Sequence, residues 1–451
     1  MEPYPAGGGL TPEPPSSRVP VRSRDARLAA TSFGEVNRGY SRSEARTEAR
    51  RGSSQDLGAA RAACPFGVDV PTMVDAIAGD DFDAALSTVL GAHPWPGILG
   101  RACKAYCERA FHSLPGGDGG EPLALKELER AAATFGRSTP PAVGARATGR
   151  TVGVIGAGAA GAAVARRLRE LGHGVVVHER LPTVGGTLAV GYPEFRLPLD
   201  VVRRELRFDR WGVDVRTGAP VDGPMLVRLL RDHDAVVVTT GQSEGVRLDV
   251  PGSDLDGVHD ALRFLTDFRL GRLTRTPHRA VVVGGGYTAH DVCRTLRRMG
   301  CEARMVYRRG EDDLRINPAV RAAYLAVLHA EGIPVTFWTA VTAIAGSGRV
   351  HAVECCPTRA GPDARPATTT IECDTVVAAI GDQADLRFLP QEVRTEDGRI
   401  AVDDQHMTSL RGLFAAGDIA TGPSGTDQAL VAGRAAAEAI DRFLTHPGAD
   451  P

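Results

Sequence analysis

The sequence predicts an α/β fold in which parallel sheets carry two dinucleotide-binding turns, preceded by a small α-helical domain. From about residue 150, short Val/Ile-rich runs alternate with Ala/Arg/Leu-periodic helices, which is the pattern of parallel sheets covered by helices. Two glycine-rich turns, at 152–161 and 281–289, each end such a run and open such a helix. One turn alone would be weak evidence. Two turns in one Rossmann-like chain indicate two dinucleotides held face to face, as in a flavoprotein that takes hydride from a nicotinamide.

Composition excludes several classes of protein. A chain of 451 residues with 43% hydrophobic residues has room for two or three domains with buried cores. The formal charge of −2 creates no field that favours nucleic acid or an anionic membrane. No apolar run is long enough for a transmembrane helix, and the N-terminus lacks a signal-peptide core. The eight cysteines follow no short regular framework, so we expect a reduced, cytoplasmic protein.

The N-terminal third divides into a tail and a helical domain. Residues 1–50 are rich in Pro, Gly, Ser and Arg, and such a composition predicts disorder, with a polar helix possible at 41–51. Residues 51–147 are expected to form the helical domain. Pro71 suits the first turn of a helix that runs through Ile77, and an aspartate can cap the next helix, through Leu90.

The remaining elements follow from apolar runs and helical periodicity. A long final helix is expected at about 426–444. Strands are expected at 151–155, 174–178, 235–239, 279–283, 303–307, 374–380 and 412–415.

The first turn reads G-x-G-x-x-G, with Gly156, Gly158 and Gly161. The first glycine permits the tight turn, the second lets the backbone approach a pyrophosphate, and the third lets the helix pack on the strand. The helix N-terminus offers N–H groups and partial positive charge to the phosphates. Glu179 follows the next strand, 23 residues after Gly156. A carboxylate there can accept both ribose hydroxyls and would repel a 2′-phosphate, so this half fits FAD or NAD.

The second turn reads G-x-G-x-x-A, with Gly284, Gly286 and Ala289. The following strand ends in Arg308 and Arg309, where an acidic residue would otherwise stand. Guanidinium groups match a 2′-phosphate bidentately, and a charged hydrogen bond contributes about 1.5–3 kcal/mol. This half therefore predicts NADPH, the alternative being a solvated arginine pair at a strand end.

These residues resemble the small subunit of NADPH-dependent glutamate synthase and the N-terminal half of dihydropyrimidine dehydrogenase. Residues 185–198, GGTLAVGYPEFRLP, resemble the family's GG-L-x-x-GIPEFRLPK. Residues 284–291, GGGYTAHD, resemble GGGNTAMD, and 307–309 match its YRR. Further matches are VVTTG at 237–241, PGSDLDGV at 251–258, FAAGDI at 414–419, GRAAA at 433–437, CPFGVDVP at 64–71 and GRACKAYCE at 100–108.

The resemblance implies a flavoprotein fold whose FAD domain is split. Residues 148–245 and 373–445 would form the FAD domain, and 246–372 would form an inserted NADPH domain. Asp418 would bind the flavin ribityl chain, and the final helix would aim its N-terminus at the flavin N1–C2=O edge. Further cofactor contacts are expected at Gly186, Thr240, Gly241, Gly381 and Gly417.

The resemblance also implies a flavin cleft lined by residues 193–196. Its candidate functional side chains are Tyr192, Glu194 and Arg196, and Arg196 is counted among the cofactor contacts. An alternative for Glu194 and Arg196 is an ion pair that holds the loop.

The helical domain departs from the family, whose members carry two [4Fe–4S] clusters there, each needing four ligands. Only Cys64 remains of the first motif. The second motif, where four cysteines are expected, has Leu99, Cys103, Cys107 and Phe111. We expect a helical domain without metal, although three thiols with a fourth ligand such as His112 could hold zinc or a three-iron cluster. The other five cysteines form no C-x-x-C pair, so nothing supports a disulfide reductase.

The sequence therefore predicts an NADPH-dependent FAD oxidoreductase. Hydride would pass from NADPH to FAD, and electrons would leave the flavin directly for a small-molecule substrate or a redox partner protein. The alternative is a partner-docking electron-transfer subunit of a larger complex, with or without a residual cluster. Neither nucleic acid nor a membrane is expected as a partner, and the oligomeric state is open.

Overall fold

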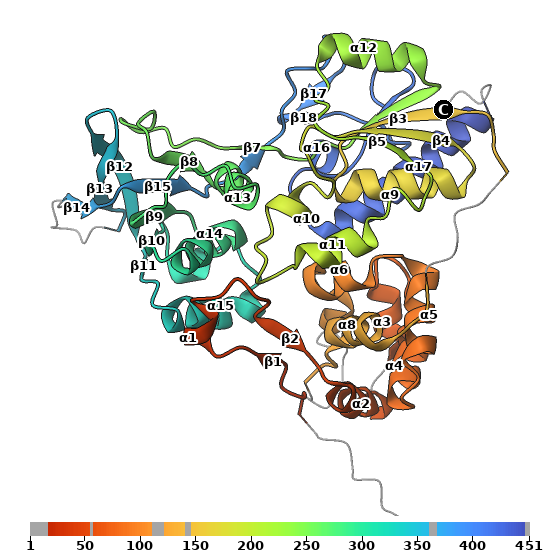
Figure 1. The fold of residues 1–451 in the computed structure, drawn as a ribbon, viewed down its shortest axis with the longest axis horizontal. Helices are drawn as coiled ribbons and strands as arrows, with labels where there is room; N and C mark the ends of the chain where they lie inside the picture. Colours follow the sequence, from red (N-terminus) through yellow and green to blue (C-terminus); the bar gives the residue numbers. More distant parts are fainter. Residues whose placement is uncertain (1–16, 55–56, 111–120, 140–145, 360–367, 447–451) are drawn as a thin grey trace, which may run out of the picture. The chain divides into compact units, whose positions relative to one another are not determined.

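The computed structural model describes residues 17–54, 57–110, 121–139, 146–359 and 368–446. The chain forms two compact units. The first, here the helical unit, contains residues 1–22 and 38–141, and the second, here the sheet unit, contains residues 23–37 and 142–451. Figure 1 shows both ribbons with their elements labelled.

Side-chain caps begin three helices of the helical unit, α2, α4 and α5. Ser41 and Glu44 form a capping box at the start of α2. Asp69 and Asp81 accept backbone N–H groups at the starts of α4 and α5, and Pro71 lies in the first turn of α4, as predicted. The elements are α2 (Arg42–Arg50), η1 (Arg51–Ser54), α3 (Leu57–Ala63), α4 (Val70–Ala78), α5 (Phe82–Ala92), α6 (Pro96–Ala102), α7 (Tyr106–Ala110) and α8 (Leu125–Phe135).

Residues 17–50 differ from the disorder that their composition predicts. Tyr40, Ala45 and Ala49 are buried in the core of the helical unit. The buried Glu48 carboxylate accepts the Val19 N–H at 2.8 Å and pairs with Arg51 at 2.7 Å. The average composition of this segment does not reveal its packing, because the few apolar side chains of the helix lie on one face. Residues 1–16 lie outside the described part of the chain.

The first sheet of the sheet unit is entirely parallel, in the order β19-β6-β3-β4-β5. Its strands are β3 (Thr151–Ile155), β4 (Gly174–His178), β5 (Asp214–Arg216), β6 (Ala235–Val238) and β19 (Leu413–Ala415). The strands predicted near 151, 174, 235 and 412 are confirmed. The associated helices are α9 (Ala159–Glu170), α10 (Thr187–Val190), α11 (Leu199–Glu205), α12 (Gly223–Asp232), α16 (Asp418–Thr421) and α17 (Thr426–Thr445).

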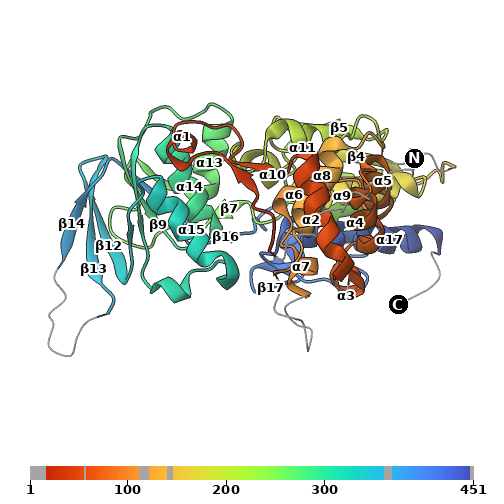
Figure 2. The ribbon, with the colours of Figure 1, turned by 90° about the horizontal axis from the view of Figure 1, so that it is seen from below.

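The second sheet is also parallel, in the order β11-β10-β9-β15-β8. Its strands alternate their side chains between two faces. Val282 and Val377 pack with buried side chains of α13 and α14, whereas Val281 and Val376 pack against the antiparallel sheet β12-β13-β14 (Figures 1 and 2). The elements are β8 (Val258–Asp260), α13 (Ala261–Arg269), β9 (Arg279–Val283), α14 (Tyr287–Arg298), β10 (Glu302–Val306), η3 (Glu311–Asp313), α15 (Pro318–Ala330), β11 (Val335–Thr336), β12 (Thr339–Gly346), β13 (Val350–Pro357), β14 (Thr369–Glu372) and β15 (Thr375–Ala378).

The predicted boundary at residue 373 needs correction. β15 pairs with β8 and β9, so residues 375–378 belong to the second sheet. An apolar run does not reveal which of two parallel sheets it joins. The chain passes between the sheets at β7 (Glu244–Gly245) and β16 (Asp382–Gln383), which pair antiparallel.

Short elements complete the chain: β1 (Arg22–Ser23), α1 (Ala26–Ala29), β2 (Asn37–Gly39), β17 (Thr395–Glu396) and β18 (Arg399–Ile400). The helix expected at 426–444 is confirmed as α17. None of the helices in the described ranges combines the length and hydropathy needed to cross a bilayer.

Helix α17 approaches α9 closely because Gly433 faces it. A Cβ at Gly433 would lie 2.3 Å from the Ala160 carbonyl oxygen, which is backbone at the start of α9. The start of α9 is therefore fixed by a backbone-to-helix contact.

We expect Gly433→Ala to destabilise the sheet unit by about 1–3 kcal/mol, because the methyl group must push α17 away from α9. Ala435→Ser, on the exposed side of the same helix, is the control and should cost less than about 0.5 kcal/mol. Urea unfolding followed by circular dichroism measures both. Equal stability of the two variants would contradict the close contact.

Candidate dinucleotide sites

The first glycine turn joins β3 to α9, and close contacts require two of its glycines. Gly156 has φ +103°, and a Cβ at Gly161 would lie 2.0 Å from the Gly156 carbonyl oxygen. Gly158, in contrast, faces open space, since a Cβ there would meet only the Cα of Gly186, at 3.9 Å. No side chain caps the start of α9. The turn thus presents backbone to a space that a phosphate group can occupy.

Glu179 lies beside this turn, as the sequence predicts. Its side chain is buried, with one carboxylate oxygen accepting the Ala157 N–H and the other the Leu181 N–H, both at 2.8 Å. Each carboxylate oxygen keeps a second lone pair for a further donor. The two backbone bonds fix the carboxylate where the hydroxyls of a ribose can reach it.

Three more predicted residues converge on the same turn. A Cβ at Gly186 would lie 2.9 Å from the Cα of Gly158, so the loop carrying Gly186 packs directly on the turn. Gly241 has φ +63° and follows β6. The Thr240 hydroxyl is buried and has no hydrogen-bond partner within the described ranges. An orphaned buried hydroxyl at this position fits a bound polar ligand such as FAD.

The closing motif brings Gly417 and Asp418 to the same region. A Cβ at Gly417 would lie 2.8 Å from the Cβ of Ala160 on α9. The Ser424 hydroxyl donates to the Asp418 carboxylate at 2.5 Å. α17 then begins at Thr426 with no side-chain cap, so the positive end of a 20-residue helix is open to an anionic group.

Gly381 lies on the passage between the sheets, with φ +139°. Its carbonyl oxygen accepts the Val246 N–H at 2.9 Å. Burial, together with the nearby carboxylates of Asp260 and Asp418, raises the pKa of the neighbouring Asp382 to about 6. Asp382 thus adds an acidic group beside Asp418 that the sequence reasoning missed.

The second glycine turn joins β9 to α14. Gly284 has φ +151°, and a Cβ there would lie 2.2 Å from the Ala379 carbonyl oxygen. Ala289 is fully buried in the helix-facing core. A Cβ at Gly286 would have only the Arg315 carbonyl oxygen near it, at 3.9 Å, so this turn is also open at its middle glycine.

Arginines gather beside the second turn. Arg308 and Arg309 follow β10 with exposed side chains, as predicted. Arg315 is a third, because its N–H donates to the Gly285 carbonyl oxygen at 2.9 Å and holds its loop against the turn. No carboxylate within the described residues pairs with these three guanidinium groups. Sequence reasoning missed Arg315, since only the fold of 310–316 brings it back to the turn.

The predicted flavin-cleft residues lie on a loop with alternating burial. Tyr192, Glu194 and Arg196 are partly exposed, and the Tyr192 hydroxyl lies 3.2 Å from that of Thr426 at the start of α17. Phe195 is 1% exposed, so it does not line a cleft as the resemblance implies. Its ring points inward because two arginine side chains enclose it.

Glu194 and Arg196 both form ion pairs, but not with each other. Glu194 pairs with Arg269 at 2.5 Å, and Arg196 pairs with Asp291. Burial alone would lower the pKa of the Arg196 guanidinium, but the Asp291 carboxylate raises it above its ordinary value. The sequence predicted the importance of the loop and gave no signal for its partners.

The three family cysteines of the helical unit lie near one another. Burial raises the pKa of the Cys107 thiol, and Glu108, Cys103, Glu129 and Cys64 act in the same direction. Two cysteine-ligated four-iron clusters do not fit, because the unit has three cysteines. Leu99 is buried, whereas Phe111 and His112 lie outside the described residues. In the described ranges no three His, Cys, Asp or Glu side chains are placed to hold a metal ion.

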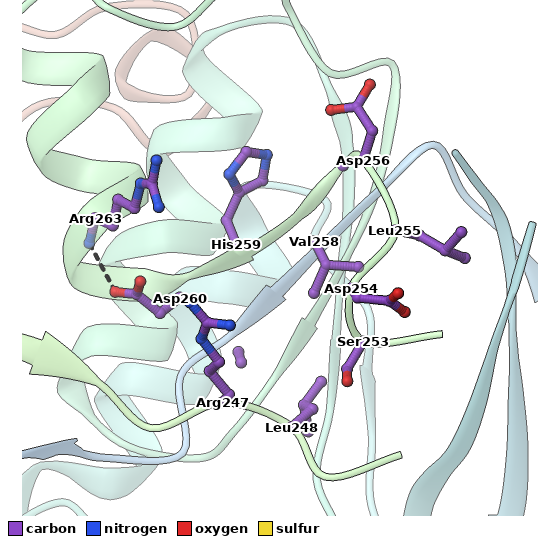
Figure 3. A pocket seen from close by; sticks show the side chains of 12 residues that line it. Arg247, Leu248, Ser253, Asp254, Leu255, Asp256, Val258, His259, Asp260 and Arg263 are labelled. Atoms are coloured by element: carbon purple, nitrogen blue, oxygen red, sulfur yellow. Dashed lines mark hydrogen bonds between the residues drawn. The ribbon is translucent and has the colours of Figure 1, made fainter. Parts of the chain in front are cut away.

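A cavity of about 300 Å³ opens beside β8 (Figure 3). Arg247, His259 and Arg263 line it together with several aspartates, and the Asp260 carboxylate accepts the Arg263 N–H at 2.8 Å. None of the residues predicted for either dinucleotide lines this cavity. The dinucleotide sites are therefore identified by their turns.

Comparisons with known proteins agree with this geometry. Residues 150–436 match the family described as pyridine nucleotide-disulphide oxidoreductase. Residues 29–139 match dihydropyrimidine dehydrogenase domain II, 4Fe-4S cluster. The glutamate synthase (NADPH) small chain of Mycobacterium tuberculosis is 30% identical, over 96% of this chain and 94% of its own length.

One other relative is a longer protein. The NADP(+)-dependent formate dehydrogenase subunit beta of Moorella thermoacetica is 33% identical over 86% of this chain, which spans 60% of that protein. Among solved structures, T. acidophilum thioredoxin reductase has a TM-score of 0.52 at 22% identity, covering 66% of this chain and 99% of its own. Mycobacterium tuberculosis FprA in complex with NADPH has a TM-score of 0.53 at 17% identity, covering 67% and 87%. At these identities the solved structures show the fold alone.

The two-sheet fold and its paired glycine turns define an FAD-dependent NAD(P)H oxidoreductase. The chain belongs to the pyridine nucleotide-disulphide oxidoreductase family. The resemblance and the fold class predicted from the sequence are thereby confirmed.

We expect Arg308→Ala to weaken NADPH binding about 10- to 150-fold and NADH binding far less, since one charged hydrogen bond to the 2′-phosphate is lost. Arg304→Ala, which changes an exposed arginine on β10, the strand that Arg308 follows, is the matched control and should change neither. Dissociation constants from fluorescence titration measure this. Equal losses for the two nucleotides would exclude a 2′-phosphate contact at Arg308.

Proposed function

We propose that this chain oxidises NADPH with a bound FAD and passes the electrons directly to a small-molecule substrate or a docked redox protein. FAD, when bound, supplies the chemistry by accepting a hydride and releasing electrons to an acceptor. The observation that supports this proposal is the contrast between the two open glycine turns. The first has a fixed carboxylate beside it, Glu179. The second is followed by Arg308 and Arg309, whose guanidinium groups pair with no carboxylate among the described residues.

The protein's own groups would bind and orient the two cofactors. The backbone of the first turn and Glu179 would hold the adenosine half of FAD, and Asp418 its ribityl chain. The start of α17 would stabilise negative charge on the reduced flavin, because that helix end carries partial positive charge. Arg308, Arg309 and Arg315 would hold the 2′-phosphate of NADPH.

We expect the purified protein to be yellow and its flavin absorbance to bleach when NADPH is added without oxygen. NADH at the same concentration should bleach it at least about 10-fold more slowly, since it lacks the group that the arginines recognise. Stopped-flow absorbance near 450 nm measures both. A colourless protein, or equal rates with both nucleotides, would contradict the proposal.

A second candidate function is a partner-docking electron-transfer subunit. Relatives of this chain bear the names of subunits, such as the glutamate synthase small chain and a formate dehydrogenase beta subunit. The observation that favours it is that Cys103, Cys64 and Glu129 all lie near enough to Cys107 to raise the pKa of its thiol. Under this candidate, one cluster in the helical unit would carry electrons to the partner.

Iron and acid-labile sulfide analysis of protein prepared without oxygen separates the two candidates. Direct exit from the flavin predicts less than about one iron per chain, because the unit lacks the cysteines that two clusters require. About four irons per chain, lost in Cys107→Ser, would overturn direct exit and establish the second candidate. Cys356→Ser, a partly exposed thiol in the sheet unit, is the control.

We also propose a cytoplasmic location. All eight cysteines lie in the described part of the chain, and none is disulfide-bonded. Thiols in that state are typical of a reducing compartment.

A further inference from the structure

Within the sheet unit, the first-sheet lobe is the first parallel sheet with its associated helices, and the second-sheet lobe is the second parallel sheet with α13, α14 and α15. The loop at residues 193–198, here the clamp loop, belongs to the first-sheet lobe but contacts α13 and α14 of the second-sheet lobe. It follows α10 and turns sharply, with the Arg196 and Leu197 N–H groups both donating to the Pro193 carbonyl oxygen, at 2.9 and 3.0 Å. Away from this loop, the chain itself links the lobes through β7 and β16, which are two residues each. Contacts of the clamp loop therefore help to set the distance between the two glycine turns.

The central contact is the ion pair between Arg196 and Asp291. Asp291 is 5% exposed and lies one turn into α14, the helix that the second glycine turn opens. Arg196 also lies 5.0 Å from the ring centroid of Tyr192, which contacts the start of α17. The pair thus connects the first turn of α14 to the residues expected beside the flavin.

A second ion pair acts in parallel. Arg269, on α13, pairs with Glu194 at 2.5 Å and donates to the Ala189 carbonyl oxygen at 2.9 Å. The Glu194 carboxylate also accepts the Leu199 N–H, at 3.2 Å. Arg269 therefore holds both Glu194 of the clamp loop and α10, the helix that precedes the loop.

Phe195, between the two paired residues, is enclosed by cations. The guanidinium groups of Arg298 and Arg294 lie 4.0 and 4.7 Å from its ring centroid. Both arginines share the buried carboxylate of Glu331, at 2.8 and 2.6 Å. This packing anchors the buried Phe195 ring of the clamp loop on α14.

The N-terminal segment 23–37 covers the same place. The Val36 N–H donates to the Phe195 carbonyl oxygen at 2.9 Å, and Arg298 donates to the Ser32 carbonyl oxygen at 3.1 Å. The Phe33 and Phe268 rings lie 5.1 Å apart. Segment 23–37 therefore ties the clamp loop to α13 and α14 from outside.

We propose that Asp291 is a positioning residue for hydride transfer, acting through Arg196 to fix the nicotinamide-binding lobe against the flavin loop. This inference rests on the proposed function. Hydride transfer needs reacting atoms about 3–3.5 Å apart, and a misplacement of about 1 Å costs on the order of 100-fold in rate. A buried ion pair that loses one charge leaves the other uncompensated, so the loop must rearrange.

The test measures flavin reduction by NADPH in the full chain, by anaerobic stopped-flow over a range of NADPH concentrations. We expect Asp291→Asn to lower the limiting rate of flavin reduction about 10- to 100-fold while the NADPH dissociation constant changes less than about two-fold. The long-wavelength charge-transfer absorbance between reduced flavin and NADP⁺ should fall with it. The exchanged pair Arg196→Asp with Asp291→Arg should recover part of the rate.

Two variants separate positioning from general stability. Asp200→Asn breaks the exposed Asp200–Arg204 pair next to the clamp loop and should leave the rate unchanged. Leu296→Ala opens a cavity in the core face of α14 and lowers stability without touching the clamp loop. If Asp291→Asn does not fold, the same rates are measured on Arg196→Lys, which keeps the positive charge at that position.

The outcomes distinguish this proposal from the proposed function. If the unaltered protein is not reduced by NADPH, the proposed function fails. If it is reduced, and Asp291→Asn is as fast or faster, the positioning role is wrong while the proposed function stands. Equal slowing by Leu296→Ala would also overturn the positioning role, because stability alone would then explain the rate.

Discussion

The structure depends on backbone packed against backbone, without side chains between, at the start of α9. A Cβ at Gly161 would lie 2.0 Å from the Gly156 carbonyl oxygen, and a Cβ at Gly433 would lie 2.3 Å from that of Ala160. These close approaches bring α17, the start of α9 and the first glycine turn together. The second turn repeats the constraint, with 2.2 Å between a Cβ at Gly284 and the Ala379 carbonyl oxygen.

The sequence predicted these features well because their causes are local. The glycine turns, the neighbouring strands, Glu179 and the arginines after β10 all follow from residue type and spacing along the chain. The caps of α2, α4 and α5 are local in the same way.

Features that depend on tertiary packing were missed or wrong. The sheet membership of residues 375–378, the order of residues 17–50 and the inward direction of Phe195 require knowledge of the neighbours. Arg315 and Asp291 reach the sites from other segments, and no spacing rule marks them.

Under the proposed function, electrostatic contrast would let two similar turns bind different dinucleotides. A carboxylate fixed by two backbone N–H groups favours ribose hydroxyls, whereas exposed guanidinium groups favour a phosphate. The clamp loop lies between these sites and carries one ion pair to each of α13 and α14. In this proposal the two lobes recognise the dinucleotides, and the clamp loop aligns the nicotinamide with the flavin.

The most direct test of this account is a crystal structure of the protein with FAD and NADP⁺. We predict that the FAD ribose contacts Glu179, that the 2′-phosphate of NADP⁺ contacts Arg308, Arg309 and Arg315, and that the Arg196–Asp291 pair is intact. A structure with the 2′-phosphate away from all three arginines, or with FAD at the second turn, would contradict the account.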